Sequence, residues 1–295
     1  MASGSRKRNA RIKSVIVYTG ALLVLAYLIG PFLWLLTSSF QTETALLSVP
    51  PSWIPNPVDV SSYVELLTGA FKDDASGVPY QSRVFLPSLV NSFIVAFSVS
   101  ALSVAIGSYA AYPLARMRFR GRNVLMFTIL ATRLIPALAL AVPFYLVARN
   151  LGMLDRLETL VIINLSFVLP YVIWLLQSYF RTIPMDLEDA GRIDGCSRRQ
   201  VVTKIIMPLA LPGLVSAGIL AFLLTWGEFF FALILTSSEN AYTSTVVAAM
   251  FATDVDVNYV TIITAGVLSV LPPVLFALVF QRYIVSGLLS GSVKG

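Results

Sequence analysis

The residues that covalent catalysis needs are scarce in this 295-residue chain. It contains no histidine, which excludes imidazole catalysis and histidine-ligated metal sites. The single cysteine, Cys196, can form neither an intramolecular disulfide nor a thiolate metal cluster. The chain also lacks a G-x-x-x-x-G-K-S/T loop for binding nucleotide phosphates. We therefore expect a non-catalytic protein with no metal or cofactor of its own.

Two full charges, Arg133 and Glu228, interrupt apolar stretches of the sequence. Each would cost about 2.5–3.5 kcal/mol at the centre of a bilayer, so each should face protein or water. We do not expect a direct ion pair, because the two residues lie at different depths. Measured from the end of its apolar stretch that is expected to face the cytoplasm, Arg133 lies ~14 Å and Glu228 ~28 Å along a helix. Arg133 suits a polar solute pathway and a helix–helix contact equally well, whereas Glu228 suits a structural role better. Asn164, Tyr171 and Trp226 share this ambiguity, and all five residues are candidates for a solute pathway.

The most informative polar segment is residues 184–208, which predicts two short helices joined at a glycine. Pro184 fits the first helical turn, where its missing amide donor costs nothing. Asp186, Glu188 and Asp189 follow it and oppose the positive end of the helix dipole. Gly195 suits the left-handed residue that ends a helix.

The second predicted helix of this segment begins at Ser197, which has capping-box spacing to Gln200. Val201, Ile205 and Leu209 then form an i, i+4, i+8 apolar stripe. These features also describe a pair of amphipathic helices lying on a membrane surface. The pattern of residues alone leaves both interpretations open.

The elements that position these residues are predicted to be membrane helices. Hydrophobic residues make up 57% of the chain and charged residues only 12%, about half the charged share of a soluble domain. A helix needs about 20 apolar residues to cross a bilayer. Six stretches qualify: Val15–Leu36, Leu89–Tyr112, Val124–Ala148, Leu160–Phe180, Leu209–Leu235 and Val260–Phe280. We predict an all-α integral membrane protein with six transmembrane helices in a single domain, 1–295.

The distribution of basic residues predicts the orientation of the chain. Sixteen of the 21 Lys and Arg residues fall in the N-terminal segment 1–13, the loop after the second stretch, the loop 184–208 and its flanks, and the tail 284–295 with Arg282 before it. Because basic loops stay in the cytoplasm, these segments and both termini are expected there. The same asymmetry explains the net charge of +6 without nucleic acid. The first stretch is longer than a signal-peptide core and lacks a clear cleavage site, which favours an uncleaved helix.

Three segments are then expected outside: Ser38–Gln81, Arg149–Thr159 and Thr236–Tyr259. The first is rich in proline, which favours extended or turn backbone. The third carries Glu239, Asp254 and Asp256 and no basic residue. We expect it to be long enough to reach a docked partner.

The segment 184–208 resembles the EAA loop of ABC importer permeases, whose pattern is Glu-Ala-Ala, three residues, Gly, nine residues, Ile, one residue, Leu-Pro. Asp189-Ala190-Gly191 stands at the Glu-Ala-Ala positions, Gly195 at the glycine, and Ile205, Met207 and Pro208 at the end. The departures are Asp189, Gly191 and Met207, and Gly191 weakens the first helix by up to about 1 kcal/mol. Similarity to permeases for maltose and other carbohydrates extends to Asn91-Ser92, to residues 110–116 and to the C-terminal tail.

The resemblance implies a permease subunit that passes a sugar, oligosaccharide or polyol inward by alternating access. It implies a bacterial or archaeal plasma membrane, a second homologous permease subunit, two ATP-binding subunits that hold ATP and Mg²⁺, and an extracytoplasmic solute-binding protein. The residues expected to contact an ATP-binding subunit are Glu188, Asp189, Ala190, Gly191, Asp194, Gly195, Arg198 and Arg199. The alternative function is an ion-coupled or passive transporter, which needs no ATPase.

Overall fold

The structure, a computed structural model, describes residues 2–69, 78–253 and 258–292, with side chains for residues 13–69, 78–252 and 258–283. Lys72, Asp254, Asp256 and Lys294 lie outside the described residues, as do the side chains of residues 1–12 and of the tail 284–295. Every regular element within the described ranges is helical, as predicted. Four helices are long and apolar enough to span a membrane, or up to six if each of two bent helix pairs is one span.

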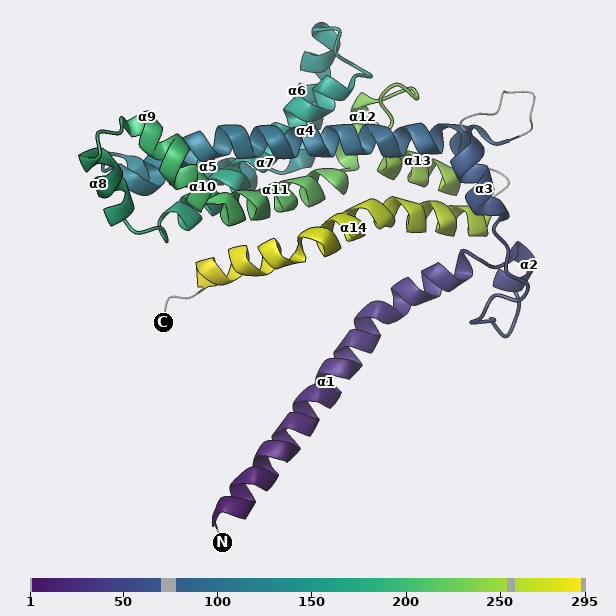
Figure 1. Ribbon diagram of the computed structural model, residues 1–295. Coiled ribbons are helices and arrows are strands. Elements are labelled where there is room, and N and C mark those ends of the chain that lie inside the picture. The colour runs from purple at the N-terminus through teal and green to yellow at the C-terminus, as the bar shows by residue number, and fades with distance from the viewer. Residues whose placement is uncertain (1, 70–77, 254–257, 293–295) are drawn as a thin grey trace.

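Three helices form the centre of the bundle: α4 (Tyr80–Arg116), α7 (Leu157–Phe180) and α11 (Leu211–Trp226) (Figure 1). Glycines bring these helices close together. A Cβ atom on Gly107 would lie 2.8 Å from Val172 Cγ1, and one on Gly213 would lie 2.4 Å from the Tyr179 ring. Close packing holds helices together in lipid, where apolar side chains gain little by leaving the hydrocarbon. The predicted spans two and four lie within α4 and α7.

The predicted third span, Val124–Ala148, is not one continuous helix. It consists of α5 (Arg122–Ala131), the 3₁₀ turn η3 (Thr132–Leu134) and α6 (Ala137–Asn150). The helical segments before and after Ile135-Pro136 meet at 88°. Pro136 forces the break because it has no amide to donate and keeps the residue before it out of the helical region, and Ile135 has a ψ of 121°.

The predicted fifth span, Leu209–Leu235, is also interrupted. α11 ends at Trp226, and the six-residue helix α12 (Phe230–Leu235) begins after a short break. At the other end, α11 meets the preceding helical segment, Arg198–Leu209, at 74°. Two of the six predicted spans are therefore interrupted; the prolines of the third already indicated a break there.

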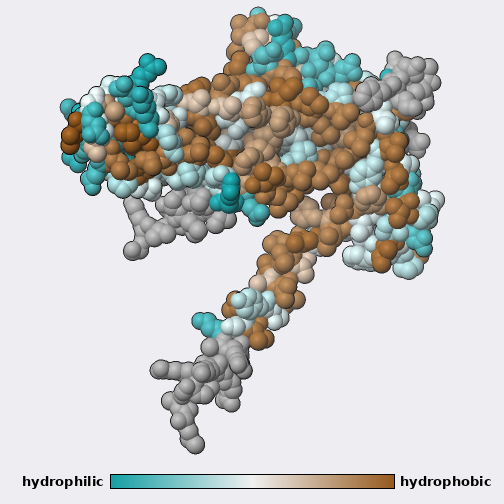
Figure 2. Space-filling view, viewed as in Figure 1, coloured by the Kyte–Doolittle hydropathy of each residue, from teal (hydrophilic) through white to brown (hydrophobic). Residues whose placement is uncertain are grey.

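The first and last long helices differ in how they meet the bundle. α14 (Tyr259–Ser292) runs along α11, and the Ser216 hydroxyl donates to the Tyr283 carbonyl. α1 (Ala2–Ser38) contacts the bundle at its C-terminal end, where Thr264 donates to the Ser39 carbonyl over 3.4 Å, and otherwise diverges from it (Figure 1). In this view hydrophobic residues cover the part of α1 nearest the bundle and most of the length of the bundle, while hydrophilic residues gather at the two ends of the bundle and on the projection that contains α6 (Figure 2).

The end of the bundle opposite the loop 184–208 carries three short helices: α2 (Glu43–Leu46), α3 (Ser61–Thr68) and α13 (Ser244–Met250). The segment Thr236–Tyr259, expected as an outer loop, partly folds back into the protein. Ser244 and Val247 of α13 are fully buried, and the Asn91 amide donates to the Glu239 and Tyr242 carbonyls at 3.1 and 3.0 Å. A chain that interrupts the bundle must bury its backbone polar groups with partners. The residues of this segment that are described and remain exposed are Ser237, Glu239, Asn240, Ala252, Asn258 and Tyr259.

Asp155 joins this segment to the connection between α6 and α7. Its Oδ1 accepts hydrogen bonds from the Ser237 and Ser238 amides at 2.8 and 3.0 Å, and its Oδ2 accepts one from the Ser238 hydroxyl. Burial alone would raise the pKa of Asp155, but these hydrogen bonds to the carboxylate outweigh it and hold the pKa below its usual value. The two connections are therefore fixed to each other.

Candidate functional site

The connection between α7 and α11 forms its first helix where the sequence predicts one, but Pro184, predicted in the first turn, lies before the helix and its N-cap Met185. α8 (Asp186–Ile193) carries three acidic residues in its first turn. Gly195 has a φ of +84°, the predicted left-handed conformation. It ends the helix because the Gly195 and Cys196 amides turn back to the Arg192 and Gly191 carbonyls at 3.1 and 2.9 Å.

The second helix of this loop also begins as predicted. The Ser197 hydroxyl accepts from the Gln200 amide at 3.4 Å, and the Gln200 side chain accepts from the Ser197 amide at 2.8 Å, completing the capping box. The helix runs through α9 (Arg198–Gln200), the π-helical segment η4 (Val201–Ile206) and α10 (Met207–Leu209).

The predicted stripe Val201, Ile205 and Leu209 is only partly confirmed. Val201 is buried, but Leu209 is exposed and Ile206 is fully buried instead. A π-helical turn contains more than four residues, so it shifts the apolar face by about one position along the chain. The sequence pattern assumed a continuous α-helix and could not include this shift.

Gly191 lies where α8 packs against the second helix of the loop. A Cβ atom at this position would lie 2.3 Å from Cδ1 of Ile205. Alanine would force the end of the Ile205 side chain to rotate away. The departure from the Glu-Ala-Ala pattern at Gly191 therefore has a packing reason.

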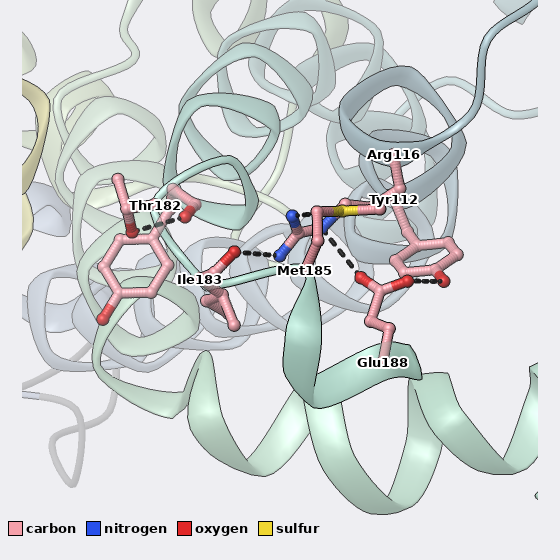
Figure 3. A network of polar contacts seen from close by, with 7 residues as sticks. Tyr112, Arg116, Thr182, Ile183, Met185 and Glu188 are labelled. Atoms are coloured by element: carbon pink, nitrogen blue, oxygen red, sulfur yellow. Dashed lines mark hydrogen bonds and ion pairs between the residues drawn. The ribbon is translucent and has the colours of Figure 1, made fainter. Parts of the chain in front are cut away.

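A buried network joins α8 to the end of α4 (Figure 3). Arg116 Nε lies 2.8 Å from Glu188 Oε1, and the two side chains are only 6% and 8% exposed. The Tyr112 hydroxyl donates to Glu188 Oε2 at 2.9 Å, and Arg116 Nη2 donates to the Ile183 carbonyl at 2.6 Å. Each charge thus has a partner, which a buried ion pair requires. This network holds the start of α8 against α4.

Sequence reasoning missed this network. It counted Arg116 as a loop charge and grouped Glu188 with residues that contact a partner. The available signal was the spacing of Tyr112 and Arg116, which places both on one face of a helix and opposite an acidic turn. Glu188 and Gly191 are buried in the structure, so neither lies on the exposed surface of the loop.

The other predicted contact residues are each exposed: Asp189, Ala190, Asp194, Gly195, Arg198 and Arg199. Beside them, Ile193 is 86% exposed, and this apolar side chain was not predicted. A cleft of about 250 Å³ opens between α8 and the end of α4 and is lined in part by Asp189, Arg192 and Arg198. The surface therefore combines both charges with an apolar tip.

The solute-pathway candidates separate into two groups. The Arg133 guanidinium lies over the rings of Tyr171 and Phe167, 4.6 and 5.6 Å from their centroids. Such contacts stabilise a cation by about 0.5–2 kcal/mol without neutralising it. Tyr171 is partly exposed. Arg133 and Tyr171 thus form one polar site beside the break at Pro136.

Glu228, Asn164 and Trp226 have structural partners. Glu228 caps α12 by accepting from the Phe231 and Ala232 amides at 2.7 and 3.1 Å, and the Asn164 amide interacts with its carboxylate. The buried Trp226 indole donates to the Ser269 carbonyl at 3.0 Å. The preference for a structural role at Glu228 agrees with this geometry, and its partners differ from those of Arg133.

Comparison with known proteins assigns the chain. The family described as binding-protein-dependent transport system inner membrane component matches residues 103–290. The chain belongs to this family. The matched region contains the loop 184–208, so the resemblance of this loop to that of importer permeases is confirmed at the level of the family.

Curated relatives of this permease align along almost its whole length. A probable ABC transporter permease protein y4oR of Sinorhizobium fredii is 34% identical over 97% of this chain and 98% of its own. The trehalose/maltose transport system permease protein MalG of Thermococcus litoralis is 32% identical over 98% and 99%. The trehalose transport system permease protein SugB of Mycobacterium tuberculosis is 34% identical over 92% and 95%.

Solved structures agree on the fold. A subunit of a bacterial ABC transporter involved in the import of the acidic polysaccharide alginate superposes with a TM-score of 0.75 at 24% identity. The match covers 94% of this chain and 98% of that one. At this identity the likeness supports the permease fold and does not extend to the solute.

The network between α8 and α4 predicts a strong dependence of the permease's stability on Glu188. Glu188→Ala should lower the free energy of unfolding by about 3–5 kcal/mol, because it leaves the Arg116 charge buried without a partner. Replacing both residues, Glu188→Leu with Arg116→Met, should restore part of the loss. Asp189→Ala is the matched control, since its side chain is exposed and the change should stay within about 0.5 kcal/mol. Thermal unfolding of the purified protein measures all three, and equal effects of Glu188→Ala and Asp189→Ala would contradict the prediction.

Proposed function

We propose that this permease passes a carbohydrate across the membrane as one subunit of an ATP-driven importer, by alternating access. The observation that carries the proposal is the loop between α7 and α11, which combines an exposed mixed-charge surface with rigid attachment to α4. Relatives named as permeases for trehalose, maltose and sulfoquinovosyl glycerol support a carbohydrate as the solute. Hydrolysis of ATP, with its Mg²⁺, takes place on separate subunits.

The proposed mechanism couples an ATP-binding subunit to the helices through α8. A partner holds the exposed surface around Asp189, Ile193 and Arg198. When the partner moves, the Glu188–Arg116 ion pair transmits the displacement to α4, because the pair is short and its atoms are buried. α4 packs along α7 and α11 and therefore carries the motion to the membrane-spanning core.

The remaining partners follow from the family and the outer surface. A second, homologous permease subunit completes the pathway. One ATP-binding subunit docks at the loop 184–208 of this chain, and another docks at the corresponding loop of the second permease. A solute-binding protein delivers the solute from outside. The exposed residues near Ser237 and Asn240, fixed by Asp155, are one part of the predicted outer segment that can contact it.

The proposed coupling predicts different outcomes for valine substitutions at two glycines that both have a left-handed backbone. Gly195 and Gly152 have φ values of +84° and +64°, and neither would bring a Cβ atom within 4 Å of another residue. Valine at either position costs about 1–3 kcal/mol of backbone strain. Gly195→Val should reduce carbohydrate-stimulated ATP hydrolysis in proteoliposomes, and co-purification of the ATP-binding subunit, by about five- to 150-fold. Gly152→Val, in the connection between α6 and α7, should change ATP hydrolysis and co-purification by less than about twofold.

Normal stimulation in Gly195→Val would remove the loop from the mechanism. Failure of any ATPase to co-purify with the wild-type permease would instead favour the alternative of an ion-coupled or passive transporter. The two outcomes are distinguishable in the same preparation.

The proposed orientation, with both termini and the loop 184–208 in the cytoplasm, can be tested with the native cysteine. Cys196 is partly exposed in that loop. A membrane-impermeant maleimide applied to intact cells should leave it unlabelled, whereas a permeant maleimide should label it. A cysteine at Asn240 in a Cys196→Ser background should react with both reagents. Labelling of Cys196 by the impermeant reagent in sealed cells would reverse the orientation.

Arg133 and Tyr171 are the proposed contacts of this chain with the solute. A hydrogen bond from a charged group contributes about 1.5–3 kcal/mol. Arg133→Met should therefore slow solute uptake by about ten- to 100-fold while the complex assembles and its unstimulated ATP hydrolysis persists. Trp226→Phe, which alters a buried structural residue, is the control and should act through stability instead. If Arg133→Met lowers thermal stability and leaves the uptake rate per folded complex unchanged, Arg133 is a helix–helix contact only.

A further inference from the structure

The connection from α4 to α5 carries an unusual concentration of positive charge. Arg118, Arg120 and Arg122 occur at every second position, and Arg181 follows the last residue of α7, the helix against which α5 packs. Among the described residues, none of these four guanidinium groups is in an ion pair or donates a side-chain hydrogen bond. The Arg122 Nε atom is buried and has no partner. The cluster is therefore positively charged without compensation within the described chain.

The backbone adds to this charge. α5 begins at Arg122 after the left-handed Gly121, which has a φ of +86°. Its first turn has no acidic residue and its N-cap makes no side-chain hydrogen bond. Helix starts normally carry an acidic or hydroxyl side chain, because their first amides are free donors and the dipole is positive there. At this helix the sequence places arginine instead.

Three of these arginines, Arg118, Arg120 and Arg122, line a wide-open cavity of about 560 Å³ formed by residues 118–124. The charges also influence one another across the two segments. Burial and the positive charge of Arg122 both lower the pKa of the Arg181 guanidinium. An anion placed in this cavity would meet several donors and relieve the repulsion.

The surface directly beyond the cavity is apolar. Val124, Leu125 and Phe127 of α5 are exposed, Phe127 by 70%, and no residue of α5 is buried. Phe127 lies only about one and a half turns from the helix start. A ligand that fits the whole surface therefore needs an anionic group and hydrocarbon in immediate succession.

We propose that the arginine cluster and α5 form a binding site for an anionic glycerophospholipid, with the lipid phosphate in the cavity and its acyl chains along the exposed face of α5. Basic clusters at the ends of membrane helices attract such headgroups. An acidic segment of another subunit could satisfy the arginines alone, but it would leave the adjoining apolar face uncovered. A free phosphate ion would do the same.

The test measures lipid retention by the complete chain in detergent, with native mass spectrometry and equal supplies of phosphatidylglycerol and phosphatidylcholine. The wild-type chain should retain phosphatidylglycerol preferentially. Each arginine near a headgroup contributes about fivefold to binding, so Arg120→Gln with Arg122→Gln should reduce retention by at least about tenfold. The matched control is Arg149→Gln with Arg156→Gln, which removes the same charge from the end of α6 and the start of α7. It should change retention less than about twofold.

Further arms of the experiment separate the source of the anion and guard against misfolding. Glycerol phosphate in excess should compete weakly, because it lacks acyl chains, and equally strong competition by it would indicate a free-phosphate site. Arg120→Lys with Arg122→Lys should keep most of the retention even if the glutamine variant unfolds. Equal retention of phosphatidylglycerol and phosphatidylcholine by the wild-type chain would overturn the proposal. So would a glutamine variant that loses co-purification of the ATPase but retains phosphatidylglycerol as the wild-type chain does.

Discussion

The structure depends on one constraint: hydrocarbon offers no hydrogen bonds, so each backbone group released where a helix breaks must find a partner inside the protein. Polar side chains meet this requirement at the breaks before α12 and α13, and a third fixes the connection that follows α12 in the same way. Glu228 binds the first amides of α12, Asp155 binds the amides that follow α12, and Asn91 binds the carbonyls of the segment before α13. A mixed helical path, with short helices folded back among long ones, is stable because these residues are placed at its breaks.

The same constraint explains how charge is distributed. Arg116 and Glu188 are buried together as an ion pair, and replacing such a pair by apolar residues is often no worse for stability than keeping it. What the pair adds is a directional connection between α8 and α4 that apolar side chains would lack. The arginines of the α4–α5 connection have no such partners among the described residues, and Arg118 and Arg120 are exposed at the edge of the fold. Charged residues inside the fold fix the positions of helices, whereas charged residues at its edge are available to bind groups outside the chain.

Local backbone features fix the shape of the loop 184–208 along the proposed route of coupling. Gly195 sets the angle between α8 and the next helix through its left-handed backbone, and Gly191 allows those helices to pack closely. The π-helical turn after Gln200 shifts the apolar face so that Ile206 fills the core. These local features make the loop one compact body attached at Glu188, which is what transmission of a displacement requires.

The amino-acid sequence by itself determined the features that depend on composition and near neighbours. Apolar runs set the membrane helices, Gly195 set a helix end, and Ser197 with Gln200 set the next helix start, because hydropathy, left-handed backbone and capping act within a few residues. Tertiary structure alone decided the partners of Arg116 and Arg133, the 88° angle at Pro136, the burial of α13 and the need for glycine at residue 191. Each of these depends on which distant helix lies alongside, and helices that are apolar on every face carry little periodic signal to specify their neighbours.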